Sequence, residues 1–62
     1  MPKTDDIFQV LIVDDEQNIR DGSERILSRI GFEVLQASTG AEALDILAKQ
    51  TIEIVLLDLK MP

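Results

Sequence analysis

Three short apolar segments alternate with two helical patterns along this chain, and this order leaves few folds open to it. The apolar segments cover residues 8–13, 32–36 and 52–57, and the helical patterns cover about residues 17–30 and 40–50. Because the connections are short, each helix must carry the chain back across the sheet, which makes the strands parallel. The sequence therefore predicts an α/β fold with the element order β-α-β-α-β.

The ends of both predicted helices carry recognisable signals. Gly31 suits the position just after the first helix, where a left-handed backbone closes it. Thr39 and Glu42 fit a capping box, in which the Thr39 hydroxyl accepts from the Glu42 N–H and the Glu42 side chain reaches back. The apolar positions of the two helices are expected to belong to the core. They are Ile19, Ile26, Leu27, Ile30, Leu44 and Leu47.

Size and composition exclude several classes of function. The 62 residues form at most one domain, and they include no Cys and no His, which excludes thiol and imidazole catalysis and a Cys/His zinc site. The net charge of −6 argues against direct nucleic-acid contact and against an anionic membrane surface. The longest fully apolar runs have four residues, too short for a membrane span or a signal-peptide core. We therefore expect a cytoplasmic protein.

Two carboxylates follow matching apolar strands. Asp14 follows residues 10–13, and Asp58 follows residues 54–57. If these strands are parallel neighbours, Asp14, Asp15 and Asp58 crowd one edge of the sheet, where ligands of open α/β sheets bind. Carboxylates crowded in this way either take up a proton or bind a cation, and an all-oxygen ligand set suits Mg²⁺. The alternative without a ligand is that Asp14 and Asp15 belong only to a solvated acidic loop at a helix start.

The residues around these carboxylates carry a resemblance to a known family. LIVDDE at residues 11–16 and LLDLKMP at residues 56–62 resemble the receiver domain of two-component response regulators. The resemblance covers most of the chain but only the first half of that domain. It implies half of a flavodoxin-like doubly wound parallel sheet with strand order 2-1-3. It also implies a truncated receiver domain over residues 1–62, ordered from about residue 8 to residue 62.

The resemblance assigns a role to each matching residue. Asp58 would accept a phosphoryl group from a sensor histidine kinase. Asp14, Asp15 and Asp58 would hold Mg²⁺, Asp15 most directly and Asp14 partly through water, and Lys60 would add its backbone carbonyl. Such a module is a switch and not an enzyme. The Ser or Thr of the family's fourth strand and the Lys of its fifth strand have no counterpart in this chain.

Other functions remain open at this level. A haloacid dehalogenase-type phosphatase also places a nucleophilic Asp after a parallel strand, but it needs an Asp two residues later, where this chain has Lys60 after Asp58 and Glu16 after Asp14. The other alternative is a non-signalling half-receiver that acts as an interaction piece, or a fragment of a longer regulator. We also expect the apolar edge at residues 54–57 to favour a homo-oligomer.

Overall fold

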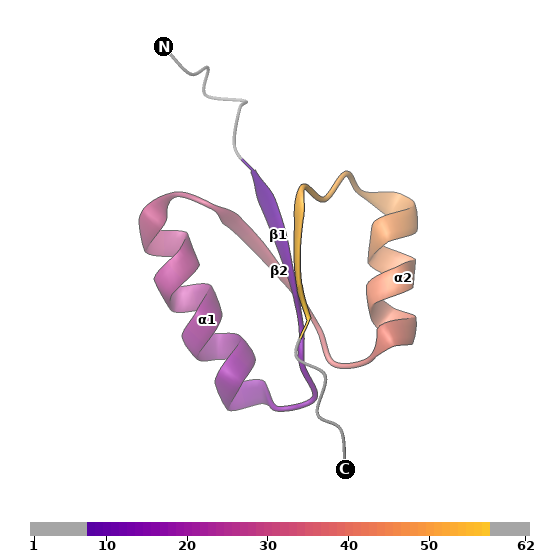
Figure 1. The fold of residues 1–62 in the computed structure, drawn as a ribbon, viewed down its shortest axis with the longest axis horizontal. Coiled ribbons are helices and arrows are strands. Elements are labelled where there is room, and N and C mark those ends of the chain that lie inside the picture. Colours follow the sequence, from indigo (N-terminus) through magenta and orange to yellow (C-terminus); the bar gives the residue numbers. More distant parts are fainter. Residues whose placement is uncertain (1–7, 58–62) are drawn as a thin grey trace.

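The computed structural model describes residues 8–57, and these form three strands and two helices (Figure 1). Their bounds are β1 (Gln9–Val13), α1 (Gln17–Ile30), β2 (Glu33–Ala37), α2 (Gly40–Lys49) and β3 (Ile54–Leu57). The predicted β-α-β-α-β order is confirmed, and the observed ends lie within two residues of the predicted ones. Short apolar runs and helix-end signals are local properties of the sequence, which explains this agreement.

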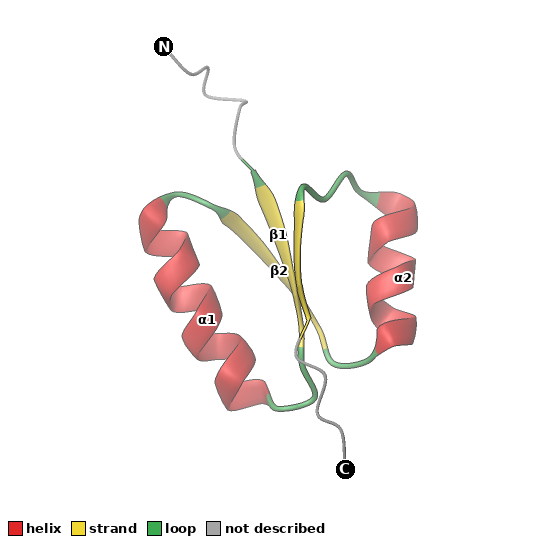
Figure 2. Ribbon diagram, viewed as in Figure 1, coloured by secondary structure: helices red, strands yellow, loops and turns green. Residues whose placement is uncertain are grey.

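The three strands form one parallel sheet in the order β2-β1-β3, as the resemblance implied. Val13 at the end of β1 aligns with Ala37 of β2 on one side and with Leu57 of β3 on the other. Helix α1 lies on one side of the sheet and α2 on the other (Figure 2). Strand β1 therefore has a strand on each side and a helix above each face.

This central position explains why β1 is apolar without interruption after Gln9. Its last four residues, from Val10 to Val13, are all buried, and Leu11 has no exposed surface. Leu11 and Val13 pack with Ala37 of β2 and Ala43 of α2. A strand that is covered on both faces gains from apolar side chains at every position, whereas a strand covered on one face alternates.

The prediction that the apolar stripes of the helices belong to the core is wrong for five of the six residues. Leu27 is half-buried, but the other five are between 40% and 69% exposed. They are Ile19, Ile26, Ile30, Leu44 and Leu47. Helix periodicity reveals an apolar side but not what covers it, and nothing among residues 8–57 buries these five side chains.

The predicted end of α1 is confirmed in detail. Gly31 has a φ of 113°, in the left-handed region that favours glycine. The Gly31 N–H donates to the Ser28 carbonyl, and the Phe32 N–H donates to the Leu27 carbonyl, both at 3.1 Å. This pair of hydrogen bonds is the Schellman motif, which satisfies two of the carbonyls that the helix end leaves open.

The start of α2 is capped almost as predicted. The Glu42 N–H donates to the Thr39 hydroxyl at 3.1 Å. The Glu42 side chain does reach back, but it reaches Ser38, one residue before the cap. Its Oε1 accepts from the Ser38 N–H at 2.8 Å and from the Ser38 hydroxyl at 2.9 Å. These two donors, together with the positive charge of Arg20, hold the pKa of Glu42 below its ordinary value.

The two halves of this cap should respond differently to pH. Because folding lowers the pKa of Glu42, its contribution to the free energy of unfolding is full above the ordinary Glu pKa and is lost as the pH falls through the lower folded value. Thr39→Ala should cost about 1 kcal/mol at every pH, since a hydroxyl does not titrate there. Glu42→Gln should cost most at neutral pH and little in acid. Urea unfolding at a series of pH values measures both, and a cost of Glu42→Gln that is independent of pH would contradict the assignment.

Candidate functional site

The candidate site begins where β1 ends, at Asp14. This residue is only 3% exposed, although it carries a carboxylate. Its N–H continues the sheet by donating to the Ala37 carbonyl at 3.1 Å. Its Oδ1 accepts from the Glu16 N–H at 2.9 Å, a contact that turns the loop back over the side chain. Asp14 is therefore fixed through both its backbone and its carboxylate.

The loop between β1 and α1 gathers three carboxylates. Asp14, Asp15 and Glu16 can each offer one oxygen such that these oxygens all lie within 4.8 Å of one another. Asp14 is buried, whereas Asp15 and Glu16 are exposed. A set of carboxylate oxygens at this spacing, with one side open to water, fits a hard divalent cation that keeps several of its water ligands.

The structure tests only part of the predicted ligand set. It brings Asp14 and Asp15 together, and it adds Glu16, to which the sequence analysis gave no metal role. Asp58 and Lys60 lie outside the described residues. The register pairs Val13 with Leu57, the last residues of β1 and β3.

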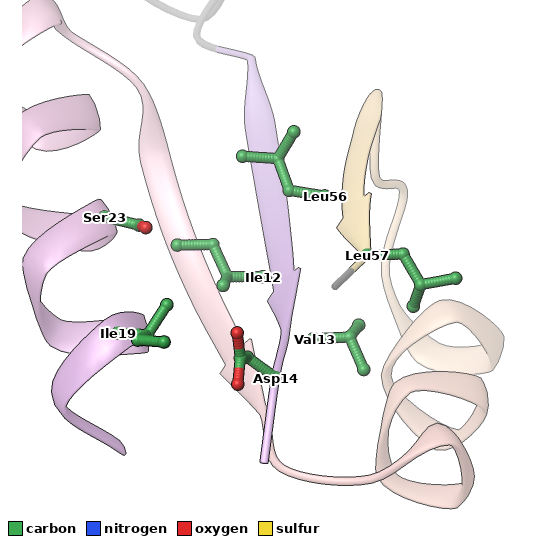
Figure 3. A pocket seen from close by; sticks show the side chains of 7 residues that line it. All are labelled: Ile12, Val13, Asp14, Ile19, Ser23, Leu56 and Leu57. Carbon is green, nitrogen blue, oxygen red and sulfur yellow. The ribbon is translucent and has the colours of Figure 1, made fainter. Parts of the chain in front are cut away.

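An open hollow lies beside Asp14 (Figure 3). Its volume is about 220 Å³, and among residues 8–57 Asp14 is the one charged residue that lines it. The lining residues are Ile12, Val13, Asp14, Ile19, Ser23, Leu56 and Leu57. Ser23 lies in the gap that interrupts the apolar stripe of α1, so a small side chain leaves this space open. An apolar wall lowers the local dielectric, which strengthens any interaction of the Asp14 carboxylate with a cation.

A polar network holds α1 against β2 next to the same loop. The Arg20 guanidinium donates through Nη1 to the Asp14 carbonyl at 2.7 Å and through Nε to the Gln36 Oε1 at 3.0 Å. The Gln36 amide nitrogen donates in turn to Asp21, at 3.2 Å, and to Glu24. The sequence analysis missed all four residues. The available signal was Gln36 directly after the apolar residues Val34 and Leu35 of a strand, opposite a helix whose apolar stripe is interrupted.

Comparison with known proteins identifies the family. The family model of the response regulator receiver domain matches residues 10–62. The chain belongs to the receiver domain family. The chain corresponds to only part of a receiver domain, which agrees with the resemblance to the first half of that domain. The family match favours this interpretation over the phosphatase alternative.

Several curated relatives are similar to this receiver. It is 41% identical over 54 residues to sporulation initiation phosphotransferase F of Bacillus subtilis, and the match covers 87% of this chain and 44% of that protein. It is 43% identical over 54 residues to the CAI-1 autoinducer sensor kinase/phosphatase CqsS of Vibrio cholerae, with 87% of this chain and 8% of that protein covered. The probable transcriptional regulator ycf27 of Guillardia theta is 48% identical over 54 residues, which are 87% of this chain and 21% of the relative. The chain thus spans less than half the length of each of these relatives.

Membership of the family supplies the general setting of the site. Receiver domains bind Mg²⁺ and are usually non-enzymatic signalling modules of two-component systems, whose members work with sensor kinases. The acidic cluster at the end of β1 fits that setting. No solved structure matches the chain. Within residues 8–57, neither helix is long and apolar enough to cross a membrane.

Proposed function

We propose that this chain is the phosphoacceptor part of a two-component receiver, and that Asp58 takes a phosphoryl group from a sensor histidine kinase. The observation that carries the proposal is the carboxylate cluster at the end of the central strand, with Asp14 buried and Asp15 exposed beside it. Residues 8–62 form the receiver portion in this proposal. A cytoplasmic location belongs to the same proposal.

The proposal assigns the ligands of Mg²⁺ to Asp14, Asp15, Asp58 and the backbone carbonyl of Lys60. By the family resemblance, Asp15 would contact the cation most directly and Asp14 would act partly through water. Asp15 is exposed, and the buried Asp14 carboxylate accepts from the Glu16 N–H. When bound, Mg²⁺ offsets the negative charge that gathers on the phosphoryl oxygens.

In the bond-forming step this chain supplies the nucleophile, a carboxylate. An oxygen of Asp58 forms a bond to phosphorus while the bond from phosphorus to the kinase histidine nitrogen breaks, and an acyl phosphate results. The family's fourth and fifth strands carry a Ser or Thr and a Lys that respond to the phosphoryl group, and this sequence holds no equivalent of them. We therefore propose that the 62 residues are incomplete for switching.

Removal of the Asp15 charge should weaken divalent cation binding. We expect Asp15→Asn to lower Mn²⁺ affinity by about tenfold or more, since the number of charged ligands sets the affinity of such sites. Calorimetric titration of the wild-type chain and the variant measures this. The matched control is Asp45→Asn, which removes a carboxylate that pairs with Lys49 on α2. Equal heats from wild type and Asp15→Asn would refute the assignment.

Phosphorylation should depend on Asp58. Treatment with acetyl phosphate and Mg²⁺ should add about 80 Da, one phosphoryl group, to a fraction of the wild-type chain. The yield should be lower than in a complete receiver, because the Ser or Thr and Lys partners are missing. Intact-mass measurement should find the adduct on Asp45→Asn and not on Asp58→Asn. An adduct on Asp58→Asn places the phosphoryl group elsewhere and ends the proposal.

A second candidate function is the binding of another protein chain, and the exposure of β3 favours it. All four of its residues are exposed, by 36% to 56%, although all are apolar. Within residues 8–57, β3 has a neighbouring strand on one side only. An apolar edge of this kind can pair with another chain. We propose that a second copy of this chain pairs with it.

The hydrogen bonds of β3 define how such a copy would pair. The Glu53 N–H donates to the Gln9 carbonyl of β1. Backbone groups alternate in direction along a strand, so those of Ile54 and Leu56 point away from β1. A two-fold axis at Val55 then pairs Ile54 of each copy with Leu56 of the other, in antiparallel fashion. This arrangement keeps the two acidic clusters apart, which matters because each copy carries a net charge of −6.

This pairing predicts that the 62-residue chain is a dimer and that Leu56→Lys makes it monomeric. Leu44→Lys is the control, since Leu44 is an equally apolar, 69% exposed residue on α2 rather than on the edge. Light scattering at tens of micromolar measures the mass of each protein. A folded, monodisperse wild-type monomer would show that β3 does not pair with a second copy.

A further inference from the structure

Arg20 donates a hydrogen bond to the backbone carbonyl of Asp14, at the point where strand β2 ends. The Asp14 N–H donates to Ala37, so in a regular parallel ladder the N–H of residue 39 would donate to the Asp14 carbonyl. Strand β2 ends at Ala37, however, and Thr39 is already the cap of α2. The Arg20 Nη1 donates to the Asp14 carbonyl instead, at 2.7 Å. One side chain thus extends the hydrogen bonding of β1 by one step.

The guanidinium is itself held in place by β2. Its Nε donates to the Gln36 Oε1, and the Gln36 amide nitrogen is directed to Asp21 and Glu24 of α1. The side-chain oxygen of Gln36 therefore faces the Arg20 guanidinium, and its NH₂ group faces the carboxylates of Asp21 and Glu24. This leaves the side-chain amide one favourable orientation. Both contacts use the planar fork of Arg20, which a Lys side chain cannot reproduce.

We propose that Arg20 is a positioning residue that fixes the peptide between Asp14 and Asp15 and so aims the Asp15 carboxylate at the divalent cation. The proposal rests on the metal-binding function proposed above. The carbonyl that accepts from Arg20 belongs to the same rigid peptide group as the Asp15 N–H. When this peptide group is held in one orientation, the backbone position from which the Asp15 side chain extends is fixed as well. Outer contacts that orient a ligand commonly contribute 10- to 100-fold to metal affinity.

The sign of the effect separates this role from a simple effect of charge. A positive charge beside a cation site repels the cation, so loss of a bystander Arg would tighten binding. Loss of a positioning Arg weakens binding instead. Arg29→Met is the matched control, because Arg29 lies in the last turn of the same helix, at the end remote from Asp14.

The experiment compares the 62-residue wild type with Arg20→Met, Arg20→Lys and Arg29→Met. Mn²⁺ affinity is measured by electron paramagnetic resonance, in which the signal of free Mn²⁺ falls as the ion binds. The ¹⁵N shift of the Asp15 amide is measured without metal, because it reports the hydrogen bond to the Asp14 carbonyl. We expect Arg20→Met and Arg20→Lys to bind Mn²⁺ about tenfold more weakly and to shift the Asp15 amide. Arg29→Met should change neither quantity.

The outcomes keep the two proposals distinct. A folded Arg20→Met that binds Mn²⁺ as tightly as wild type, or more tightly, overturns the positioning role. If Arg20→Met does not fold, Arg20→Lys decides by the same criterion, because it keeps the charge and the aliphatic stem. If the wild type binds no Mn²⁺, the metal site fails, and with it the role of Arg20 in aiming Asp15. A changed ¹⁵N shift of the Asp15 amide in Arg20→Lys would then show that Arg20 orders this peptide without any role in metal binding.

Discussion

The rest of the structure depends on the burial of β1 between two parallel strands and two helices. Its apolar side chains supply most of the buried residues that the structure describes, and its backbone bonds to a neighbour on each side. The chain must leave this apolar environment at one point, and it does so at Asp14. A carboxylate at that point is costly to bury unless donors or cations surround it. The Glu16 N–H supplies one such donor, and the neighbouring carboxylates of Asp15 and Glu16 make a bound cation more favourable.

The parts of the fold that were predictable from the sequence are those set by local chemistry. Gly31 and Thr39 mark helix ends through backbone geometry that only nearby residues determine. The apolar run before Asp14 indicates a strand buried on both faces, and the structure confirms it. The sheet order 2-1-3 came from the resemblance to receivers, since the periodicity of short strands does not specify which of them are neighbours.

The parts that were not predictable depend on contacts between distant segments. The exposure of Ile26 and Leu44 could not be deduced from spacing, because a stripe shows which residues could be buried and not which are. The link from Arg20 to Gln36 joins residues that are 16 positions apart and polar, so hydrophobic patterns are blind to it. Glu16 was visible as an acid, but its part in the carboxylate cluster follows from the turn of the loop. The structure leaves Asp58 and Lys60 outside its described residues, so their roles rest on the family alone.

The double pairing of β1 also determines the order in which the fold can come apart. Release of β3 leaves β1 bonded to β2, and release of β2 leaves it bonded to β3, so partial opening from either edge spares the central strand. The amide hydrogens of Leu11 and Val13 point toward β3, so they should exchange with solvent once β3 is released, whereas those of Val10 and Ile12 point toward β2 and stay protected until β2 is released. The outward-facing amide of Leu56 should exchange readily. The acidic loop is tied to the element that opens last. Release of β3 would therefore leave the hydrogen bonds around Asp14 intact, because the Asp14 N–H and the Arg20 side chain both bond to β2.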